Sequence, residues 1–241
     1  EGWLAETSDI TLRGFPNRFD TTFSNLSLAD PDAGLALDLP FFQLFALSYQ
    51  PNHLIAVWPN TVFLLTPNQK LTVKSDTMHA SIVLHPGAAL ALNRANLAVE
   101  AASLTSSQGW QSSAQSLHLA AHHQTETPAT YRMAVEATGF APPSLFRLRI
   151  DPDHRLPDTF KTFKADMTVT FDGQWDRFAI ETARPQPVEI NLTLAQATWG
   201  DLDLWAAGKI RVSMIFFLID KNLLVAKNWR EIVKLARISG E

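Results

Sequence analysis

Cysteine is absent from this 241-residue sequence, and positive charge is not in excess. Without cysteine the chain has no disulfide, no thiolate zinc site and no cysteine nucleophile. The 20 Lys and Arg residues are outnumbered by 24 Asp and Glu residues, which gives a formal net charge of −4. Proteins that bind nucleic acid present a basic surface to its phosphates, so a nucleic-acid partner is not expected.

Long apolar runs are missing as well. No run reaches the roughly 18 residues that a membrane-spanning helix requires. The chain begins with Glu1 instead of a methionine. We therefore expect a signal or membrane anchor upstream of this chain.

Motifs for catalysis and phosphate binding are also lacking. There is no Gly-x-Ser-x-Gly sequence, and the ten glycines are scattered rather than gathered in a phosphate-binding loop. His118 and His122 have the i, i+4 spacing of a helical metal pair, but they lie in the alternating pattern 117–121, which is typical of a strand. The acids of 151–158 resemble a calcium loop only in number. These absences predict a protein that is not an enzyme and holds neither a metal nor a cofactor.

Apolar residues that recur at every second position are what the sequence does contain. The alternating runs are 71–73, 78–84, 97–101, 117–121, 131–137, 163–171, 188–194, 202–204 and 210–212. Such alternation predicts half-buried antiparallel strands, and the turn residues between the runs favour a meander over βαβ units. We expect a mainly β fold whose strongly curled antiparallel sheet or sheets form a groove, an open sandwich or a barrel.

Helical spacing is convincing only near the C-terminus. Trp229, Ile232 and Val233 predict a C-terminal α-helix over about 228–239. The segment 40–49 fits a short helix or a buried strand equally well. We treat 1–241 as a single β-rich domain, with halves at 1–125 and 126–226 as an alternative division.

The apolar run 212–222 does not alternate. It is interpreted as a strand buried on both faces, with an apolar patch that faces lipid or a partner as the alternative.

The opening stretch "RGFPNRFDTTF" (13–23) combines two arginines with a glycine and a proline. Pro16 removes a main-chain donor, so Gly14 and Pro16 predict a bend or bulge before a strand that begins near Phe19. Arg13 and Arg18 are expected to be solvated or paired with acids such as Asp20. The alternative is that these two arginines contact an anion among membrane headgroups.

Seven tryptophans and fifteen phenylalanines accompany only two tyrosines. Long strands with one apolar face and few helices need a second layer, a lipid or another protein to cover that face. The candidate groove or partner face is formed by Phe163, Met167, Val169, Phe171, Ile190, Leu192 and Leu194.

Several spaced segments resemble the DUF2125 family of alphaproteobacterial proteins. They are "EGWLAETSDITLRGFPNRFDTTFSNLSLADP", "PFFQLFALSYQPNHLIAVWP", "RLPDTF", "RPQPVEINLTLAQATWGDLDLWAAGKI" and "AKNWREIV". The resemblance implies a periplasmic body that follows a short cytoplasmic tail and one membrane-spanning helix. It also implies a likeness to AsmA-like envelope proteins, whose curled sheets shelter lipid acyl chains. No catalytic residue is implied.

One segment departs from the family pattern. Relatives have a Gly-rich hairpin turn between "GKIRV" and "AKNWRE", where this sequence has "SMIFFLIDKN". Residues 213–222 are therefore either an apolar insertion or a segment whose sequence assignment is unreliable.

We thus expect a periplasmic protein, tethered to the inner membrane, that binds lipid or another apolar ligand in a groove between curled sheets, for envelope maintenance or lipid transfer. One alternative is an accessory or scaffolding subunit that docks a sheet face or edge onto an inner-membrane protein complex. An unrecognised hydrolase is the third hypothesis.

Overall fold

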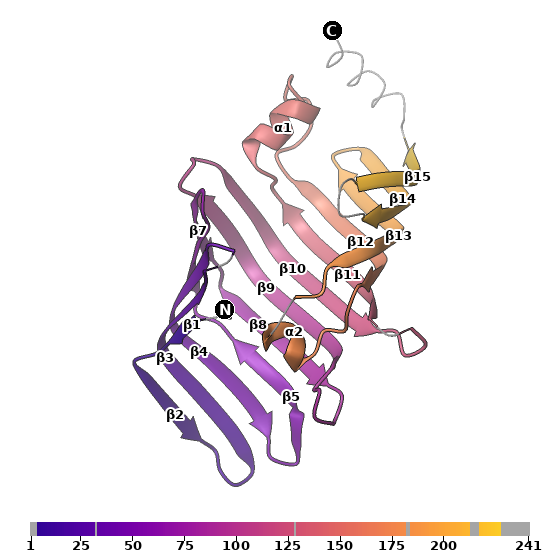
Figure 1. Ribbon diagram of the computed structural model, residues 1–241. Coiled ribbons are helices and arrows are strands. Elements are labelled where there is room, and N and C mark those ends of the chain that lie inside the picture. The colour runs from indigo at the N-terminus through magenta and orange to yellow at the C-terminus, as the bar shows by residue number, and fades with distance from the viewer. Residues whose placement is uncertain (1–3, 32, 128, 182–183, 213–216, 228–241) are drawn as a thin grey trace.

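The computed structural model describes residues 4–31, 33–127, 129–181, 184–212 and 217–227 (Figure 1). These residues form one antiparallel sheet of 15 named strands. The strands are β1 (Leu4–Glu6), β2 (Asp9–Arg13), β3 (Arg18–Asp30), β4 (Leu35–Leu47), β5 (Gln50–Val57), β6 (Thr61–Leu65), β7 (Lys70–Lys74), β8 (Thr77–Leu84), β9 (Leu92–Ser106), β10 (Gln111–His123), β11 (Thr130–Phe140), β12 (Phe160–Phe171), β13 (Pro187–Trp199), β14 (Leu202–Val212) and β15 (Phe217–Lys227). Two short helices, α1 (Ser144–Ile150) and α2 (Arg177–Glu181), lie in the connections around β12.

The pairing register shows that several named strands are parts of longer strands, and that the long strands form a simple meander. β4 pairs with β5 through 43–47 and with β6 through 36–38, so β5 and β6 are two parts of one long strand. β9 pairs in the same way with β8 and β7, and β3 pairs with β2 and β1. In the described part of the chain, twelve long strands therefore follow one another, each antiparallel to the one before it.

A line of backbone irregularities crosses the first half of this sheet, and we call it the crease. Asn25 has a φ of 48°, and it faces Pro40 because Ser24 pairs with Phe41 and Leu26 with Leu39. The breaks between β5 and β6 and between β7 and β8 lie on the same line.

The crease continues through β9, β10 and β11. Ala101, with a φ of 51°, faces Gln115 in the register between β9 and β10. Gln115 in turn faces Gly139, which has a φ of 56° and whose added Cβ would lie 2.6 Å from the Gln115 side chain. Left-handed backbone at matched positions of β9 and β11, on either side of β10, makes the sheet bend along one line.

The crease also reverses the alternation of side chains between the two faces. Phe23 and Leu26, on either side of Asn25, pack in the same apolar cluster. Val99 and Ala102, on either side of Ala101, line the same pocket. A regular strand would send these odd- and even-numbered residues to opposite faces. The apolar face is thus carried across the bend.

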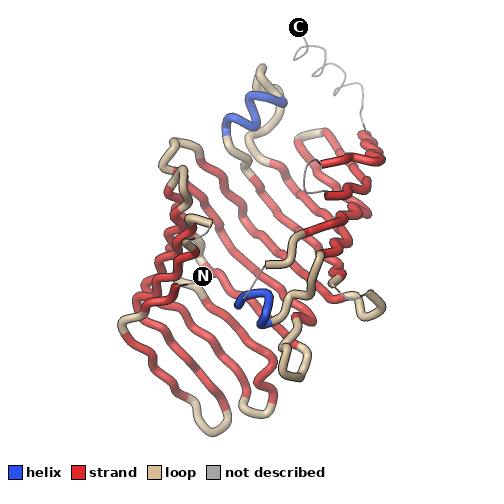
Figure 2. The backbone as a smooth tube through the Cα atoms, in the orientation of Figure 1, coloured by secondary structure: helices blue, strands red, loops and turns tan. Residues whose placement is uncertain are grey.

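The sheet curls around its apolar face, and its two ends form opposite walls (Figures 1 and 2). One buried cluster, at the β3–β4 end, is built on Leu26, Leu39 and Val62. The other, at the β12–β14 end, is built on Phe160 and Trp199, whose indole N–H donates to the Pro157 carbonyl over 2.7 Å. We call the concave, apolar face the inner face.

The expected fold class is confirmed, since the chain is mainly β and its antiparallel sheet is strongly curled. Segment 40–49 belongs largely to β4 rather than to a helix. The predicted helix over 228–239 and residues 213–216 lie outside the described residues, while 217–222 belong to the backbone of β15. Neither short helix was expected, and no helix among the described residues is long and apolar enough to cross a bilayer.

Replacing Ala101 with glycine tests the crease. Left-handed backbone costs an alanine about 1–2 kcal/mol, and glycine adopts it freely. We expect A101G to be as stable as the parent protein or more so, although glycine inside a regular strand costs about 0.5–1 kcal/mol. Urea unfolding monitored by circular dichroism measures the difference.

The matched control for this prediction is Ala98→Gly, on the regular part of the same strand. It is expected to lose about 0.5–1 kcal/mol. If both glycine variants lose the same stability, Ala101 does not sit at a strained bend.

Candidate functional site

The inner face carries one row of apolar side chains that crosses ten consecutive long strands. Each residue is paired with the next by the register, except at Phe42 and Trp58, whose rings lie 5.2 Å apart, and at Trp58 and Met78, where a main-chain N–H···O bond of 3.1 Å makes the link. The row is Phe23, Phe42, Trp58, Met78, Val99, Leu117, Ala137, Phe163, Ala197 and Leu204.

Two further rows run beside the first, on the side of the crease where β5 and β8 lie. The second row is Thr21, Leu44, Ala56, Ala80, Leu97, Leu119, Val135, Ala165, Ala195 and Ala206. The third row is Phe19, Ala46, Leu54, Ile82, Ala95, Ala121, Met133, Met167, Leu192 and Gly208. Thr21 is the one polar side chain among the thirty positions. We call these three rows the trough.

Much of the trough is only partly covered by protein. Leu97, Leu117, Leu119 and Val135 are half-buried rather than buried. In a closed sandwich such central residues would lie against a second sheet about 10 Å away. Among the described residues no second sheet faces them, because all the strands belong to one curled sheet (Figure 2).

A pocket lies where the trough meets the crease. Its volume is about 340 Å³, and its lining is almost wholly apolar. The lining includes Val73, Met78, Leu97, Leu104, Leu117 and Phe140. Val73 and Met78 also pack on the Leu26 cluster, and Phe140 packs on the Trp199 cluster. The pocket therefore joins the two clusters into one apolar surface.

The connection between β12 and β13 crosses the inner face beyond the third row, and we call its described residues, 172–181 and 184–186, the strap. Its Trp175 carbonyl accepts the Leu92 N–H over 2.7 Å, and its Arg177 N–H donates to the Ala89 carbonyl over 3.0 Å. Arg184 forms an ion pair with Asp30, at the end of β3 on the opposite wall. The strap thus bridges the curled sheet at one end of the trough, where α2 lies in Figure 1.

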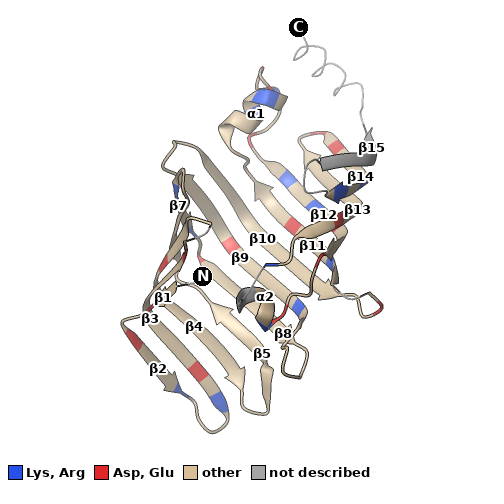
Figure 3. Ribbon diagram, in the orientation of Figure 1, with Lys and Arg blue, Asp and Glu red and all other residues tan. Residues whose placement is uncertain are grey.

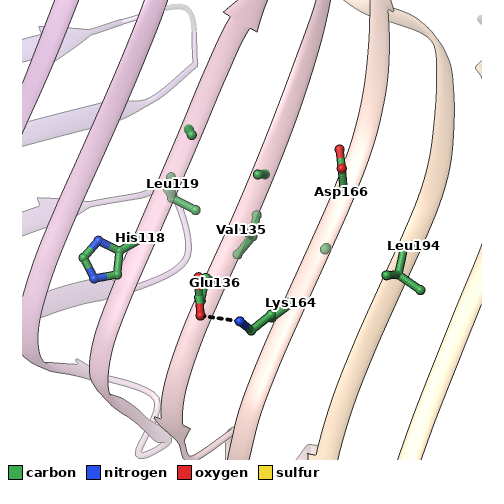
Figure 4. A pocket seen from close by; sticks show the side chains of 10 residues that line it. His118, Leu119, Val135, Glu136, Lys164, Asp166 and Leu194 are labelled. Carbon is green, nitrogen blue, oxygen red and sulfur yellow. Dashed lines mark ion pairs between the residues drawn. The ribbon is translucent and has the colours of Figure 1, made fainter.

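The opposite, outer face carries charged side chains in ion pairs. Glu136 accepts a hydrogen bond from Lys164 over 2.7 Å, and this contact lowers the pKa of the Glu136 carboxyl (Figure 4). Arg132 pairs with Asp166 and lowers the pKa of that carboxyl as well. These groups are well exposed, so their pairs contribute little to stability. Figure 3 shows how sparsely such charges are distributed over the sheet.

Most of the candidate groove residues named from the sequence lie together on the inner face. Phe163, Met167 and Leu192 belong to the trough, and Val169 pairs with Ile190 in the next row. Phe171 lies edge-on to Trp175, 5.7 Å away, under the strap. Leu194 is set apart, because a bulge between Asp166 and Met167 shifts the register and leaves Leu194 beside Asp166, 42% exposed.

Gly14 and Pro16 were predicted to form a bend or bulge, and they lie in the turn between β2 and β3, flanked by Arg13 and Arg18. Gly14 has a φ of 83°, and β3 begins directly after the turn. Arg18 donates to Asp20 over 2.7 Å, as the pairing prediction expected. Arg13 pairs in register with the same Asp20. The two arginines lie far along the chain and the sheet from the pocket at the crease.

Two groups of inner-face residues were missed at the sequence level. The first is the part of the trough on β4 to β10, including Trp58 and Leu97. Their alternation was visible, but nothing in it shows which strands lie side by side. The second is the aromatic cluster under the strap, where His123 and Tyr131 lie. Its members come from four separate segments, so no local pattern could have found it.

Comparison with known proteins gives one match. A family model described as an uncharacterized protein conserved in bacteria (DUF2125) matches residues 1–240. Neither curated proteins nor solved structures match the chain.

Alanine substitutions test whether the trough is open. Leu39 is 3% exposed in its cluster, so Leu39→Ala should cost about 2–5 kcal/mol. Leu119 is half-buried, so Leu119→Ala should cost only about 1 kcal/mol, since less apolar surface is re-exposed. Urea unfolding of protein stripped of lipid by organic or detergent washing gives both values. Equal costs would show that the trough is covered in the free protein.

Proposed function

This chain belongs to the DUF2125 family, and we propose that it binds a long, thin apolar ligand, the acyl chain of a lipid, in the trough. The observation that carries the proposal is the unbroken apolar surface of three cross-strand rows, only partly covered by the protein's own residues. Large exposed apolar surfaces on folded proteins mark sites for apolar ligands, membranes or partners.

The shape of the trough favours a lipid chain over a compact ligand. From β3 to β14 the trough crosses nine strand spacings of about 4.8 Å each, or about 43 Å along the curve. Adjacent rows are only about 7 Å apart, because their residues are two positions apart on each strand. A surface that is long, narrow and almost free of hydrogen-bonding groups matches a hydrocarbon chain and offers little to a polar molecule.

The curl of the sheet also disfavours a second protein layer as the natural cover. Two sheets pack face to face when their mean strand directions stay within about 30° and their surfaces are nearly parallel. The inner face instead wraps toward itself, so that its two ends form walls (Figure 1). A flexible chain can follow such a surface along its whole length.

In this role the protein carries a lipid and does not catalyse a reaction. It would act in the periplasm, beside the lipids of the inner membrane. The ligand would lie across the strands, with its hydrocarbon against residues such as Leu97, Leu117 and Val135. The outer face, with its paired charges, would remain in water.

A pair of aspartate variants on β10 tests this proposal. Leu117 lines the pocket, and Ala120 is exposed on the outer face three residues further on. A carboxylate in an apolar site is strongly disfavoured, so Leu117→Asp should weaken binding of the fluorescent fatty acid cis-parinaric acid at least tenfold. Ala120→Asp should stay within twofold of the parent protein. Fluorescence titration at neutral pH measures both.

Mass spectrometry of organic extracts supplies the second measurement. Parent protein and Ala120→Asp, purified from bacterial membranes, should carry acyl lipid, and Leu117→Asp should carry much less. If the parent extract holds no lipid and the two variants bind the probe equally, the trough is not a lipid site.

A further inference from the structure

Two histidine rings, those of His85 and His123, lie against each other near the strap. His123 ends β10 on the inner face and is 8% exposed. Its ring lies 5.5 Å from that of His85, edge to face, and 5.3 Å from that of Tyr131. Three ring nitrogens have no hydrogen-bond partner among the described residues: both nitrogens of His123 and Nε2 of His85. Buried polar atoms without partners are uncommon and costly.

The strap contacts Tyr131, whose ring neighbours that of His123. Its Trp175 N–H donates to the Tyr131 hydroxyl over 3.3 Å, and the Trp175 ring lies edge-on to Phe171. The strap also bonds to Ala89, inside the β8–β9 connection, and to Leu92, the first residue of β9. That same connection carries His85. Movement of the strap and exposure of the two imidazoles are therefore linked.

Protonation of His123 would place a charge on a buried ring whose two nitrogens have no hydrogen-bond partner among the described residues. Burial is the main cause that lowers the pKa of His123 below its ordinary 6.5, and the neighbouring His85 and His122 lower it further. Tyr131 has a raised pKa, chiefly through burial, and stays neutral at acidic pH. Of the two neighbouring histidines, His85 faces His123 under the strap, and His122 is exposed on the outer face of β10.

The other charged groups around the pair belong to the strap. Asp172 and Asp176 already accept main-chain N–H groups, from Gln186 and Ala179. In sequence the strap also carries Arg177, Glu181 and Arg184, and the charge of Arg184 is paired with Asp30. Carboxyl groups titrate near pH 4, so between about pH 5 and 6.5 histidine is the side chain whose charge changes.

We propose that His123, packed against His85, is an acid-sensitive switch that keeps the strap closed over one end of the inner face at neutral pH and releases it at mildly acidic pH. With the strap open, the His123 ring reaches water and accepts a proton. The direction of the pH effect follows from linkage. The open state binds more protons than the closed state, so its population rises as the pH falls below about 6.5. For His123 alone the opening equilibrium shifts by up to about tenfold per pH unit, until the lowered native pKa is reached.

Hydrogen exchange read by mass spectrometry tests the switch in the whole chain. Exchange of peptides covering 172–181 is compared at pH 7.5 and 5.5, after correction for the intrinsic rate at each pH. We expect the strap to lose protection about tenfold at pH 5.5 while peptides of β9 to β12 keep theirs. In His123→Phe, whose ring has a similar shape and no titrating group, the strap should stay protected at both pH values.

Two further variants keep the result interpretable. His118→Phe removes an exposed histidine on the outer face, so it should behave as the parent protein does. His123→Gln replaces the imidazole with a neutral polar group and serves if the phenylalanine variant fails to fold.

Equal strap protection at both pH values in the parent protein would overturn the proposal. So would an equal loss in His123→Phe or His123→Gln, or a loss of protection throughout the sheet. The readout is independent of lipid, so failure of the switch and failure of the trough as a lipid site are distinguishable.

Discussion

Main-chain pairing between neighbouring long strands is the constraint on which the rest of this structure depends. A usual β domain is held by two layers packed around a shared core. Among the described residues the buried cores are small and lie at the two ends of the curl, around Leu39 and around Trp199. Between them the antiparallel register continues from strand to strand, and it fixes which side chains lie together on the inner face.

The crease bends the sheet so that its apolar side chains form a site. Because Asn25, Ala101 and Gly139 adopt left-handed backbone at matched positions, the sheet bends along one line without losing its pairing. The same residues reverse the alternation, so apolar side chains from both sides of the bend meet on one face. The pocket at the crease and the trough beside it are consequences of this arrangement. The strap then closes one end, near the buried ring of His123 and the partly buried ring of His85.

How much of this could be predicted depends on how local each signal was. The run 163–171 predicted β12 and the face that carries Phe163 and Met167, because period-two alternation is a property of a single strand. The same reasoning failed to anticipate where Leu194 lies, since the bulge that turns it outward is set by pairing with β12. The hairpin at Gly14 and Pro16 was predictable, because those two residues restrict their own backbone.

The sequence by itself determined that this is a mainly β protein of long, half-apolar antiparallel strands, since composition, alternation and turn residues act within a few positions. Only the tertiary structure decided that those strands form one curled sheet with an open inner face. Which residues share a row depends on the register between strands, and the first row alone draws on residues from Phe23 to Leu204. The gathering of His85, His123, Tyr131 and Trp175 was likewise decided by the strap's path across the sheet, a contact between segments far apart in the chain.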